Sequence, residues 1–298
     1  MSIINDKKNR QFQKKDMLFT AREDCELLTF LLESLPNMSR NNVKNLLKNG
    51  AVYVNGISVT QYNHKLSIGQ TISVKSQSNN NSPSNIIYED KEIIVINKPA
   101  GLLSIATESE KENTAYRIIT NYVRQSDPRN RIFVVHRLDQ YTSGVLLFAK
   151  NEEIKRAFQN NWDKIVVNRG YTAIVEGKLN EKSGTIRSFL LETKTHLMYS
   201  GHSDGDGLEA VTEYRVARET SEYSLLDIRL LTGRKNQIRV HTKELGHPVI
   251  GDKKYGSTRN PIGRLGLHAN LLELKHPVTN QNMRFEAPIP QEFSRLFN

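Results

Sequence analysis

A histidine, an arginine and a carboxylate stand together in one short segment of this chain, His136-Arg-Leu-Asp139. An apolar, β-prone run over residues 132–135 leads into the segment, and a second apolar run over residues 145–149 follows it. Asp139 is therefore expected in a turn between two strands, beside Arg137, where an ionised carboxylate can act as a nucleophile or a general base. An isolated aspartate in such a turn more often serves only to cap it.

The residues around Asp139 extend this pattern into a longer motif. The string from His136 to Lys150 reads His-Arg-Leu-Asp-Gln-Tyr-Thr-Ser-Gly-Val-Leu-Leu-Phe-Ala-Lys. It resembles the signature of the RluA family of RNA pseudouridine synthases, H-R-L-D-x-x-T-S-G-x-x-x-x-A-K. This resemblance favours a catalytic Asp139 over one that only caps the turn.

Three further blocks resemble the same family and follow in the same order along the chain. They are Asn-Lys-Pro-Ala-Gly-Leu (97–102), Gly-Tyr-Thr-Ala-Ile-Val-Glu-Gly (170–177), and Leu-Thr-Gly-Arg-Lys-Asn-Gln-Ile-Arg-Val-His (231–241) with Gly-His-Pro-Val-Ile-Gly-Asp (246–252). The resemblance covers residues 86–298. One departure is the pair Lys235-Asn236, where the family more often has Thr-His. We expect this pair to alter RNA contacts and not to remove activity.

The resemblance implies a reaction and a role for five residues. Such an enzyme isomerises uridine by breaking the bond from the base nitrogen to ribose carbon 1′ and rejoining the base through carbon 5. Because nothing is oxidised or hydrolysed overall, one carboxylate suffices and no cofactor is expected. Asp139 is carried over as that carboxylate, Arg239 as its charge partner, and Tyr171 as the ring that stacks on uracil and can relay a proton. Ile238 would pack on the other side of the base, and Arg137 would fill the stack that the flipped uridine leaves.

The way in which Asp139 acts stays open at this point. It could add to the sugar or the base covalently, or it could remove a sugar proton. His136 would face away from Arg137 and Asp139 by strand alternation, so we expect it to pack or to fix the loop.

The sequence gives weak support to other chemistry. The string His-Arg-Leu-Asp resembles a kinase catalytic loop, but neither Asp-Phe-Gly nor a glycine-rich phosphate loop accompanies it. The eight histidines and one cysteine form no pattern with zinc-ligand spacing, so no metal is expected. Residues 203–207 resemble half of a calcium loop that lacks its closing glutamate. A non-catalytic RNA-binding or ribosome-assembly factor is a further alternative, against which Asp139, Tyr171 and Arg239 argue together.

Composition points to a polyanionic partner. The chain of 298 residues has 42 Lys and Arg against 32 Asp and Glu, a net charge of +10. No apolar run approaches the roughly 18 residues that span a bilayer, and the lysine-rich start lacks the apolar core of a signal peptide. One cysteine, Cys25, allows no internal disulfide framework and fits a reducing cytoplasm. We therefore expect a cytoplasmic monomer that binds RNA and no membrane.

Four segments follow one another along the chain. Residues 1–16 are basic with little to bury, and are expected to form a disordered arm. Residues 17–75 carry two helical patterns and an Asn-Gly hairpin, and predict a small α/β RNA-binding domain. The polar residues 76–85 form a linker. In residues 86–298, strand signals outnumber helical ones, which predicts an α+β catalytic domain with a mixed, mainly antiparallel sheet and peripheral helices.

The second expected helix of residues 17–75 begins at Ser39 as its N-cap and carries Arg40, Lys44 and Lys48 on one side. No acidic residue lies between these cations, so they repel one another and suit RNA phosphates. A plain solvated helix face is the alternative. Residues 22–74 also resemble the ribosomal protein S-four-like RNA-binding domain, through Ser-Arg at this helix and Val-Tyr-Val-Asn-Gly in the hairpin. Because family members with this module modify large-subunit ribosomal RNA, we expect that substrate, with transfer RNA as the alternative.

Overall fold

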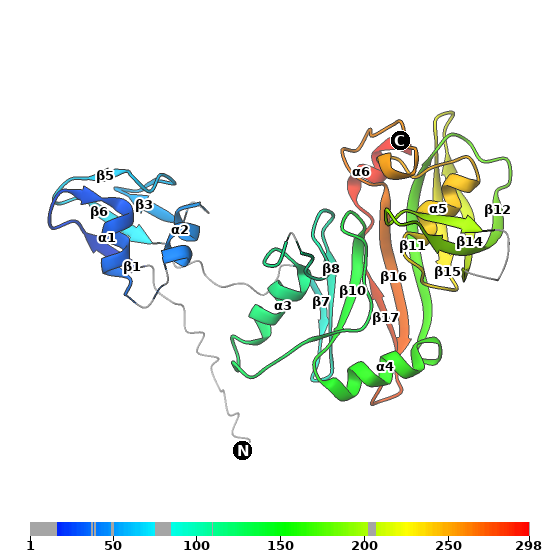
Figure 1. The fold of residues 1–298 in the computed structure, drawn as a ribbon, viewed down its shortest axis with the longest axis horizontal. Helices are drawn as coiled ribbons and strands as arrows, with labels where there is room; N and C mark the ends of the chain where they lie inside the picture. Colours follow the sequence, from blue (N-terminus) through cyan, green and yellow to red (C-terminus); the bar gives the residue numbers. More distant parts are fainter. Residues whose placement is uncertain are drawn as a thin grey trace, which may run out of the picture. The chain divides into compact units, whose positions relative to one another are not determined.

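The computed structural model describes residues 17–36, 38, 40–48, 51–74, 85–108, 110–201 and 207–297. The chain divides into two compact units, Met1–Ser82 and Pro83–Asn298, which are drawn in Figure 1. Several expectations fall outside the described residues, namely the arm at 1–16, the linker apart from Asn85, the N-cap Ser39 and most of the loop at 203–207. None of the described helices is long and apolar enough to cross a membrane.

The N-terminal unit packs two helices, α1 (Leu27–Ser34) and α2 (Arg40–Lys48), against a small antiparallel sheet. The sheet has the order β1-β6-β3-β4, with a separate pair β2-β5. Its strands are β1 Met17–Thr20, β2 Cys25–Glu26, β3 Val52–Val54, β4 Ile57–Ser58, β5 Lys65–Leu66 and β6 Thr71–Val74. Asn55 and Gly56 join β3 to β4 with φ angles of 49° and 83°, as a tight hairpin turn requires. The two helices and the hairpin agree with the pattern in the sequence.

The C-terminal unit is built on one large sheet of eleven strands (Figure 1). Its order is β13-β12-β14-β15-β11-β16-β10-β8-β7, with β17 beside β16 and β9 beside β10. The strands are β7 Ile86–Glu89, β8 Ile93–Lys98, β9 Phe133–Val134, β10 Ser143–Ala149, β11 Val166–Glu176, β12 Ser183–Glu192, β13 Met198–Gly201, β14 Leu208–Glu219, β15 Tyr223–Leu230, β16 Leu267–Lys275 and β17 Asn282–Glu286. Among the described pairs, β10 and β16 run parallel and the others antiparallel, which confirms the mixed, mainly antiparallel sheet.

Helices lie at the periphery of this sheet. They are α3 Ala115–Val123, α4 Glu152–Ile165, α5 Gln237–Glu244 and α6 Gln291–Ser294, with 3₁₀ turns at Lys253–Tyr255 and Arg295–Phe297. The side chains of Thr114 and Asn151 accept backbone hydrogen bonds and cap the starts of α3 and α4. Helix α4 includes a non-helical residue at Asn161, and its last turn carries Trp162, which packs against the core on the sheet.

The centre of the sheet is covered on both faces. Every residue of β10 is buried, and successive side chains enter two different hydrophobic clusters. Val145 and Leu147 pack with Phe158 of α4, whereas Leu146 and Phe148 pack with Ile119 of α3. This two-sided cover explains why the sequence of β10 is a continuous apolar run without alternation.

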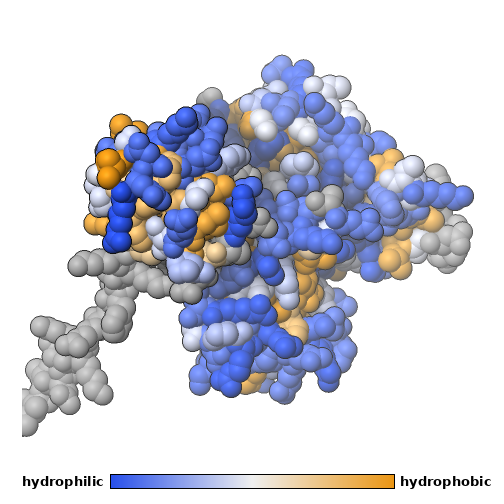
Figure 2. All heavy atoms as spheres, turned by 60° about the vertical axis from the view of Figure 1, so that its left-hand side comes forward, coloured by the Kyte–Doolittle hydropathy of each residue, from blue (hydrophilic) through white to orange (hydrophobic). Residues whose placement is uncertain are grey.

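The apolar residues collect inside the units and leave a polar exterior. Hydrophilic residues cover most of the face seen in Figure 2, and the apolar residues on it form separate small patches. This distribution is what two water-facing units with their own cores require.

Candidate active site

The Thr-Ser-Gly end of the motif fixes the strand that follows Asp139. Gly144 of β10 has a φ of 116°, and a Cβ atom there would lie 2.1 Å from the carbonyl oxygen of Ala269 on β16. Only glycine therefore allows β10 to run beside β16 at this point. Ser143 strengthens the same junction, because its Oγ lies 2.8 Å from Nδ1 of His268 and 2.5 Å from Nη2 of Arg264.

Hydrogen bonds from the Asn-Lys-Pro-Ala-Gly-Leu block fix the loop that carries Asp139. Lys98 is fully buried, and its Nζ donates hydrogen bonds of 2.8–3.0 Å to the carbonyls of Pro99, Leu102 and Gln140. Ser104 adds a reciprocal pair, because its Oγ donates to the carbonyl of Leu138 at 2.7 Å and accepts from the amide of Leu138 at 3.1 Å. Burial lowers the pKa of Lys98 to about 7, while the nearby Asp139 carboxylate opposes this shift. Sequence comparison with the family pointed to this block but gave Lys98 no role.

Arg239 lies between two carboxylates and binds one of them far more closely. Its Nε and Nη2 donate to Asp252 at 2.6 and 2.8 Å, whereas its Nη1 reaches Oδ2 of Asp139 at 3.4 Å. Arg239, carried over as the charge partner of Asp139, uses the fork of its guanidinium for Asp252, which is 1% exposed. Asp139 receives a single, longer contact and remains 33% exposed. Asp252 is the last residue of the Gly-His-Pro-Val-Ile-Gly-Asp block, and its place in that block is the one sequence feature that indicates a role for it.

Asn236 belongs to the same network. Its side chain accepts from Nη1 of Arg239 at 3.0 Å and donates to the hydroxyl of Tyr255 at 2.9 Å, and the Tyr255 ring lies 4.8 Å from the guanidinium. The expectation that the Lys235-Asn236 departure acts on RNA contacts is therefore wrong for Asn236, which is buried and orients Arg239. Lys235 is exposed and borders the cavity described below.

Tyr171 faces Asp139 from the neighbouring part of the sheet. It lies on β11 opposite Ile228, and its ring packs against apolar clusters on both sides. Burial raises the pKa of Tyr171 to about 12, with Arg169 opposing the shift and Asp139 adding to it. The phenol thus keeps its proton at neutral pH, and its hydroxyl bonds no other group in the described part of the chain. Such a hydroxyl is available to donate or relay a proton to a bound base.

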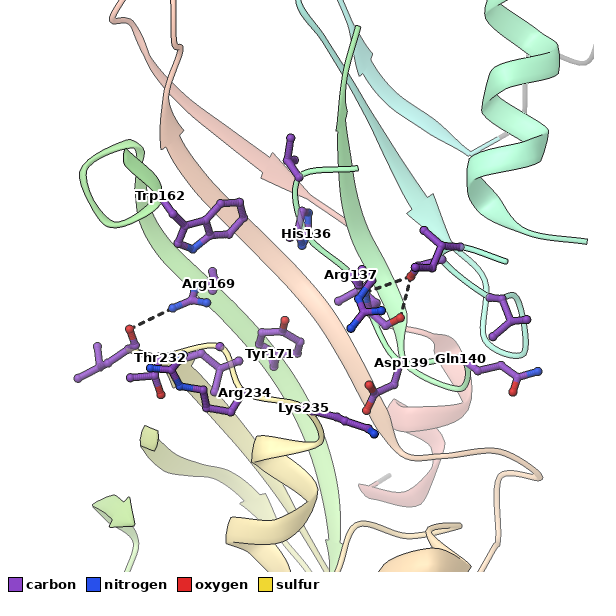
Figure 3. A pocket seen from close by; sticks show the side chains of 18 of the residues that line it. His136, Arg137, Asp139, Gln140, Trp162, Arg169, Tyr171, Thr232, Arg234 and Lys235 are labelled. Atoms are coloured by element: carbon purple, nitrogen blue, oxygen red, sulfur yellow. Dashed lines mark hydrogen bonds between the residues drawn. The ribbon is translucent and has the colours of Figure 1, made fainter. Parts of the chain in front are cut away.

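Two adjoining cavities open at this point. The smaller one, of about 70 Å³, is bordered by Asp139, Tyr171, Ile238 and Arg239. The larger one, of about 770 Å³, extends from Asp139 and Tyr171 to Trp162 and is shown in Figure 3. The structure thus brings together all five residues that the sequence assigned to the reaction and the base.

Two residues of the motif flank Asp139 in different ways. Arg137 is exposed, borders both cavities and has no ion pair with the residues described. His136 instead accepts the amide hydrogen of Leu147 on β10 at its Nε2, at 3.0 Å. Burial lowers the pKa of His136 to about 4, so the ring is neutral at pH 7. His136 therefore fixes the loop to the strand, as expected.

The cations of α2 lie in the other unit. Arg40 and Lys44 are exposed, and the Nζ of Lys44 lies 5.8 Å from the centre of the Tyr62 ring. Val43 and Leu47 are fully buried, so α2 presents its charged side away from the core. The side chain of Lys48 lies outside the described part of the structure.

Comparison with known proteins decides the family. A family model described as RNA pseudouridylate synthase matches residues 92–244, and an S4 domain model matches residues 27–72. This chain belongs to the RNA pseudouridine synthases. It is an isomerase that acts on RNA, with an S4 domain before its catalytic domain.

Relatives and solved structures agree with this assignment. A Bacillus subtilis (strain 168) protein described as an uncharacterized RNA pseudouridine synthase is 31% identical, over 97% of this chain and 98% of its own length. The ribosomal large subunit pseudouridine synthase D of Vibrio cholerae is 34% identical, over 89% of this chain and 87% of its own length. The structure of human RNA pseudouridylate synthase domain containing 1 superposes with a TM-score of 0.55 at 27% identity, covering 68% of this chain and 82% of that one.

Proposed function

We propose that Asp139 carries out the isomerisation of uridine in this synthase, assisted by Tyr171 and Arg239. The observation that supports this most directly is their convergence. Asp139 comes from the loop before β10, Tyr171 from β11 and Arg239 from α5, and all three border one small cavity. Asp252 accounts for the place of the guanidinium, whereas the Asp139 carboxylate has only its 3.4 Å contact with Arg239 and the Tyr171 hydroxyl has no partner in the described residues.

The reaction assigns a task to each group. The bond between N1 of uracil and ribose carbon 1′ breaks, a bond from carbon 5 to carbon 1′ forms, carbon 5 loses its proton, and N1 takes up a proton, so that the composition is unchanged. Asp139 supplies the nucleophile or base that starts this sequence. Arg239 places a positive charge beside the Asp139 carboxylate, while Asp252 keeps Arg239 in place. The neutral phenol of Tyr171 stacks on uracil and relays the proton from carbon 5.

Two further residues bind the target nucleotide in this proposal. Ile238 is 4% exposed and borders the small cavity, where it packs on the face of uracil opposite Tyr171. Arg137 has no ion pair within the described residues and lies at the mouth of both cavities. Its planar guanidinium takes the place of the flipped uridine in the RNA stack, which offsets part of the few kcal/mol that flipping costs.

We propose large-subunit ribosomal RNA as the substrate. Synthase D of Vibrio cholerae and of Haemophilus ducreyi are named for the ribosomal large subunit, and each aligns with at least 89% of this chain. The exposed Arg40 and Lys44 of α2, with Lys48, would bind phosphates of structured RNA. The RNA-binding domain would comprise residues 17–75 and the catalytic domain residues 86–298, joined by a linker at 76–85. The location we propose for this activity is the cytoplasm.

Mapping of pseudouridine tests both parts of the proposal. Total RNA from cells with and without this protein is treated to mark pseudouridine and read by mass spectrometry. We expect one or a few sites in large-subunit ribosomal RNA to disappear without the protein and to return with the native protein but not with Asp139→Asn. Sites confined to transfer RNA would overturn the choice of substrate, and restoration by Asp139→Asn would overturn the role of Asp139.

A further inference from the structure

The larger cavity is lined by several residues besides those assigned to the uridine and its reaction. Beyond Asp139 and Tyr171 it continues past Arg169 to Trp162, the single tryptophan of the chain (Figure 3), and residues 230–235 also line it. Its volume of about 770 Å³ is roughly ten times that of the small cavity beside it. A ligand whose base enters the small cavity therefore has neighbouring groups in the larger one.

Arg169 is held in this cavity without a carboxylate. Its guanidinium lies 5.9 Å from the centre of the Trp162 ring, and its Nη2 donates to the carbonyl of Leu231 at 3.0 Å. A Cβ atom on Gly233 would lie 2.5 Å from Nη1 of Arg169, so the glycine makes room for the guanidinium. Nε and Nη1 of Arg169 have no hydrogen-bond partner among the described residues. The Nε–H, which lies on the same edge of the guanidinium as Nη2, is therefore available to an acceptor.

A second arginine faces the same space. Arg234 is exposed, and its Nε donates to the backbone carbonyl of Glu209 at 2.9 Å. Burial lowers the pKa of Arg169, and nearby Arg234 adds to this shift, while Tyr171 and Asp163 oppose it. Asp163 also borders the cavity, but it forms no ion pair with either arginine in the part of the chain described. Arg129, Arg156 and Arg284, by contrast, each bind a carboxylate at the surface.

Position along β11 links this arginine pair to the reaction. Arg169 precedes Tyr171 by two residues, so the two side chains leave the strand on the same face, about 7 Å apart at the backbone. Two arginines that share a cavity and form no ion pair in the described residues repel each other, and an anion bound between them would offset this repulsion more fully than Asp163 at the cavity edge does. In an RNA substrate, the anion that accompanies every base is the backbone phosphate.

We propose that Arg169 and Arg234 form a binding subsite for an RNA backbone phosphate adjacent to the flipped uridine, with Trp162 as the ring that positions Arg169. This inference rests on the proposed placement of uridine between Tyr171 and Asp139. Arg169 donates its unpaired Nε–H, on the same edge of the guanidinium as Nη2, to the phosphate, and Arg234 adds a second guanidinium. The subsite sets the position of the strand next to the reacting nucleotide and takes no part in bond breaking.

Trp162 allows binding to be followed at this subsite alone. Octauridylate is titrated into the native protein and into Arg169→Gln, with Arg156→Gln, on the outer surface of α4, as the matched control. The emission of Trp162 is recorded, and the affinity is measured at several salt concentrations. We expect the native protein and Arg156→Gln to show an emission change and the same salt slope. Arg169→Gln should lose the emission change, bind about tenfold more weakly, and show a slope smaller by about 0.7, the value for one phosphate on a single strand.

Two more variants separate this role from a structural one. Arg169→Lys keeps the charge but loses the fork, so we expect the salt slope to return and the affinity to return only in part. Gly233→Ala keeps Arg169 and displaces its guanidinium, which should weaken binding in the same direction. An Arg169→Gln variant with the affinity and salt slope of Arg156→Gln overturns the proposal. Because every readout is binding, an error in the role of Asp139 would appear only in turnover and would be recognised separately.

Discussion

Charged side chains are held very differently around Asp139 and on helix α2 of the N-terminal unit. Arg239 is 12% exposed and binds Asp252 through two atoms, Asn236 through a third contact, and Asp139 at 3.4 Å. On α2, Arg40 and Lys44 extend into solvent from a helix whose other side is buried. One set of charges is fixed by several partners in a shielded place, and the other is surrounded by water.

This difference separates what each region contributes. A fixed, shielded charge stabilises a particular charge distribution during a reaction, because little reorganisation is needed when the reaction occurs. Exposed cations bind a polyanion through counterion release, and their contributions add up without demanding one geometry. Substitutions near Asp139 should therefore reduce turnover sharply, whereas substitutions on α2 should change binding gradually and depend on salt.

The largest effect is expected for Asp139→Asn. The amide has nearly the same shape but cannot act as an ionised nucleophile or base, so turnover should fall by about a thousandfold or more. RNA affinity should change less than about twofold, because binding is spread over many phosphate contacts. Release of tritium from carbon 5 of labelled uridine measures turnover, and filter binding measures affinity. Substantial tritium release by the amide variant would remove Asp139 from the mechanism.

Tyr171→Phe tests the hydroxyl without the ring. The variant keeps the stacking surface and loses the proton relay, so kcat should fall by about a hundredfold while RNA affinity stays near the native value. The same tritium assay at saturating RNA gives kcat. Tyr214→Phe is a suitable control, since that tyrosine lies on β14 outside the two cavities around Asp139. A native rate for Tyr171→Phe would limit Tyr171 to a stacking role.

Arg239→Lys breaks the shielded network at its centre. A lysine cannot reproduce the two contacts with the buried Asp252, so this variant should lose turnover by about tenfold or more. Loss of the partner of a buried carboxylate should also lower the free energy of unfolding, by up to about 3–5 kcal/mol. Arg129→Lys is the matched control, because Arg129 binds Asp127 in the same way but at the surface. Equal effects of the two lysine variants in urea unfolding and turnover would contradict the distinction between shielded and exposed pairs.

Substitutions on the basic side of α2 should weaken RNA binding gradually and leave turnover nearly unchanged. Replacing Arg40, Lys44 and Lys48 together by Ala should raise the apparent KM on long RNA by about tenfold and leave kcat within about twofold. The salt slope of RNA binding should decrease by about 0.7 for each phosphate that the variant no longer neutralises on a single strand. Deletion of residues 1–75 should weaken RNA binding in the same way and leave a folded domain that still turns over short substrates. An unchanged affinity and slope in the triple variant would make this side of α2 a plain solvated face.

The smallest effect concerns pH. His241 is fully buried between Thr212 and Ser188, and burial lowers its pKa to about 4. In the unfolded chain the His241 ring takes up a proton near pH 6.5, whereas in the folded chain it does so only near pH 4. The contribution of neutral His241 to the free energy of unfolding is therefore complete above about pH 6.5 and falls as the pH drops toward 4. His241→Asn should reduce this slope by roughly 1 kcal/mol per pH unit in urea unfolding.

The exposed His196 supplies the control for this pH effect, as His196→Asn. We expect His196→Asn to keep the native slope between about pH 6.5 and 4. A native slope in His241→Asn as well would mean that other groups carry the acid sensitivity.

The family, the order of the domains and the class of the sheet follow from the sequence alone. The motif blocks indicate these properties because several of their residues are required by the local backbone geometry. The Gly144 position must be glycine for β10 to approach β16, and the Asn55-Gly56 pair must adopt positive φ in its turn. Strand alternation and apolar runs also located most elements. The edge strands β13 and β17 are short and carry few apolar residues, so strand alternation does not mark them in the sequence.

Which charges bind each other is decided in the folded chain. Asp139, Arg239 and Asp252 come from different segments, and their spacing in the sequence says nothing about the 2.6 Å and 3.4 Å distances that separate strong from weak contacts. The roles of Lys98 and of Arg169 beside Trp162 depend likewise on packing between segments far apart in the chain. Hydrogen bonds and ion pairs weaken within an ångström, whereas sequence patterns fix only the face of an element on which a side chain lies.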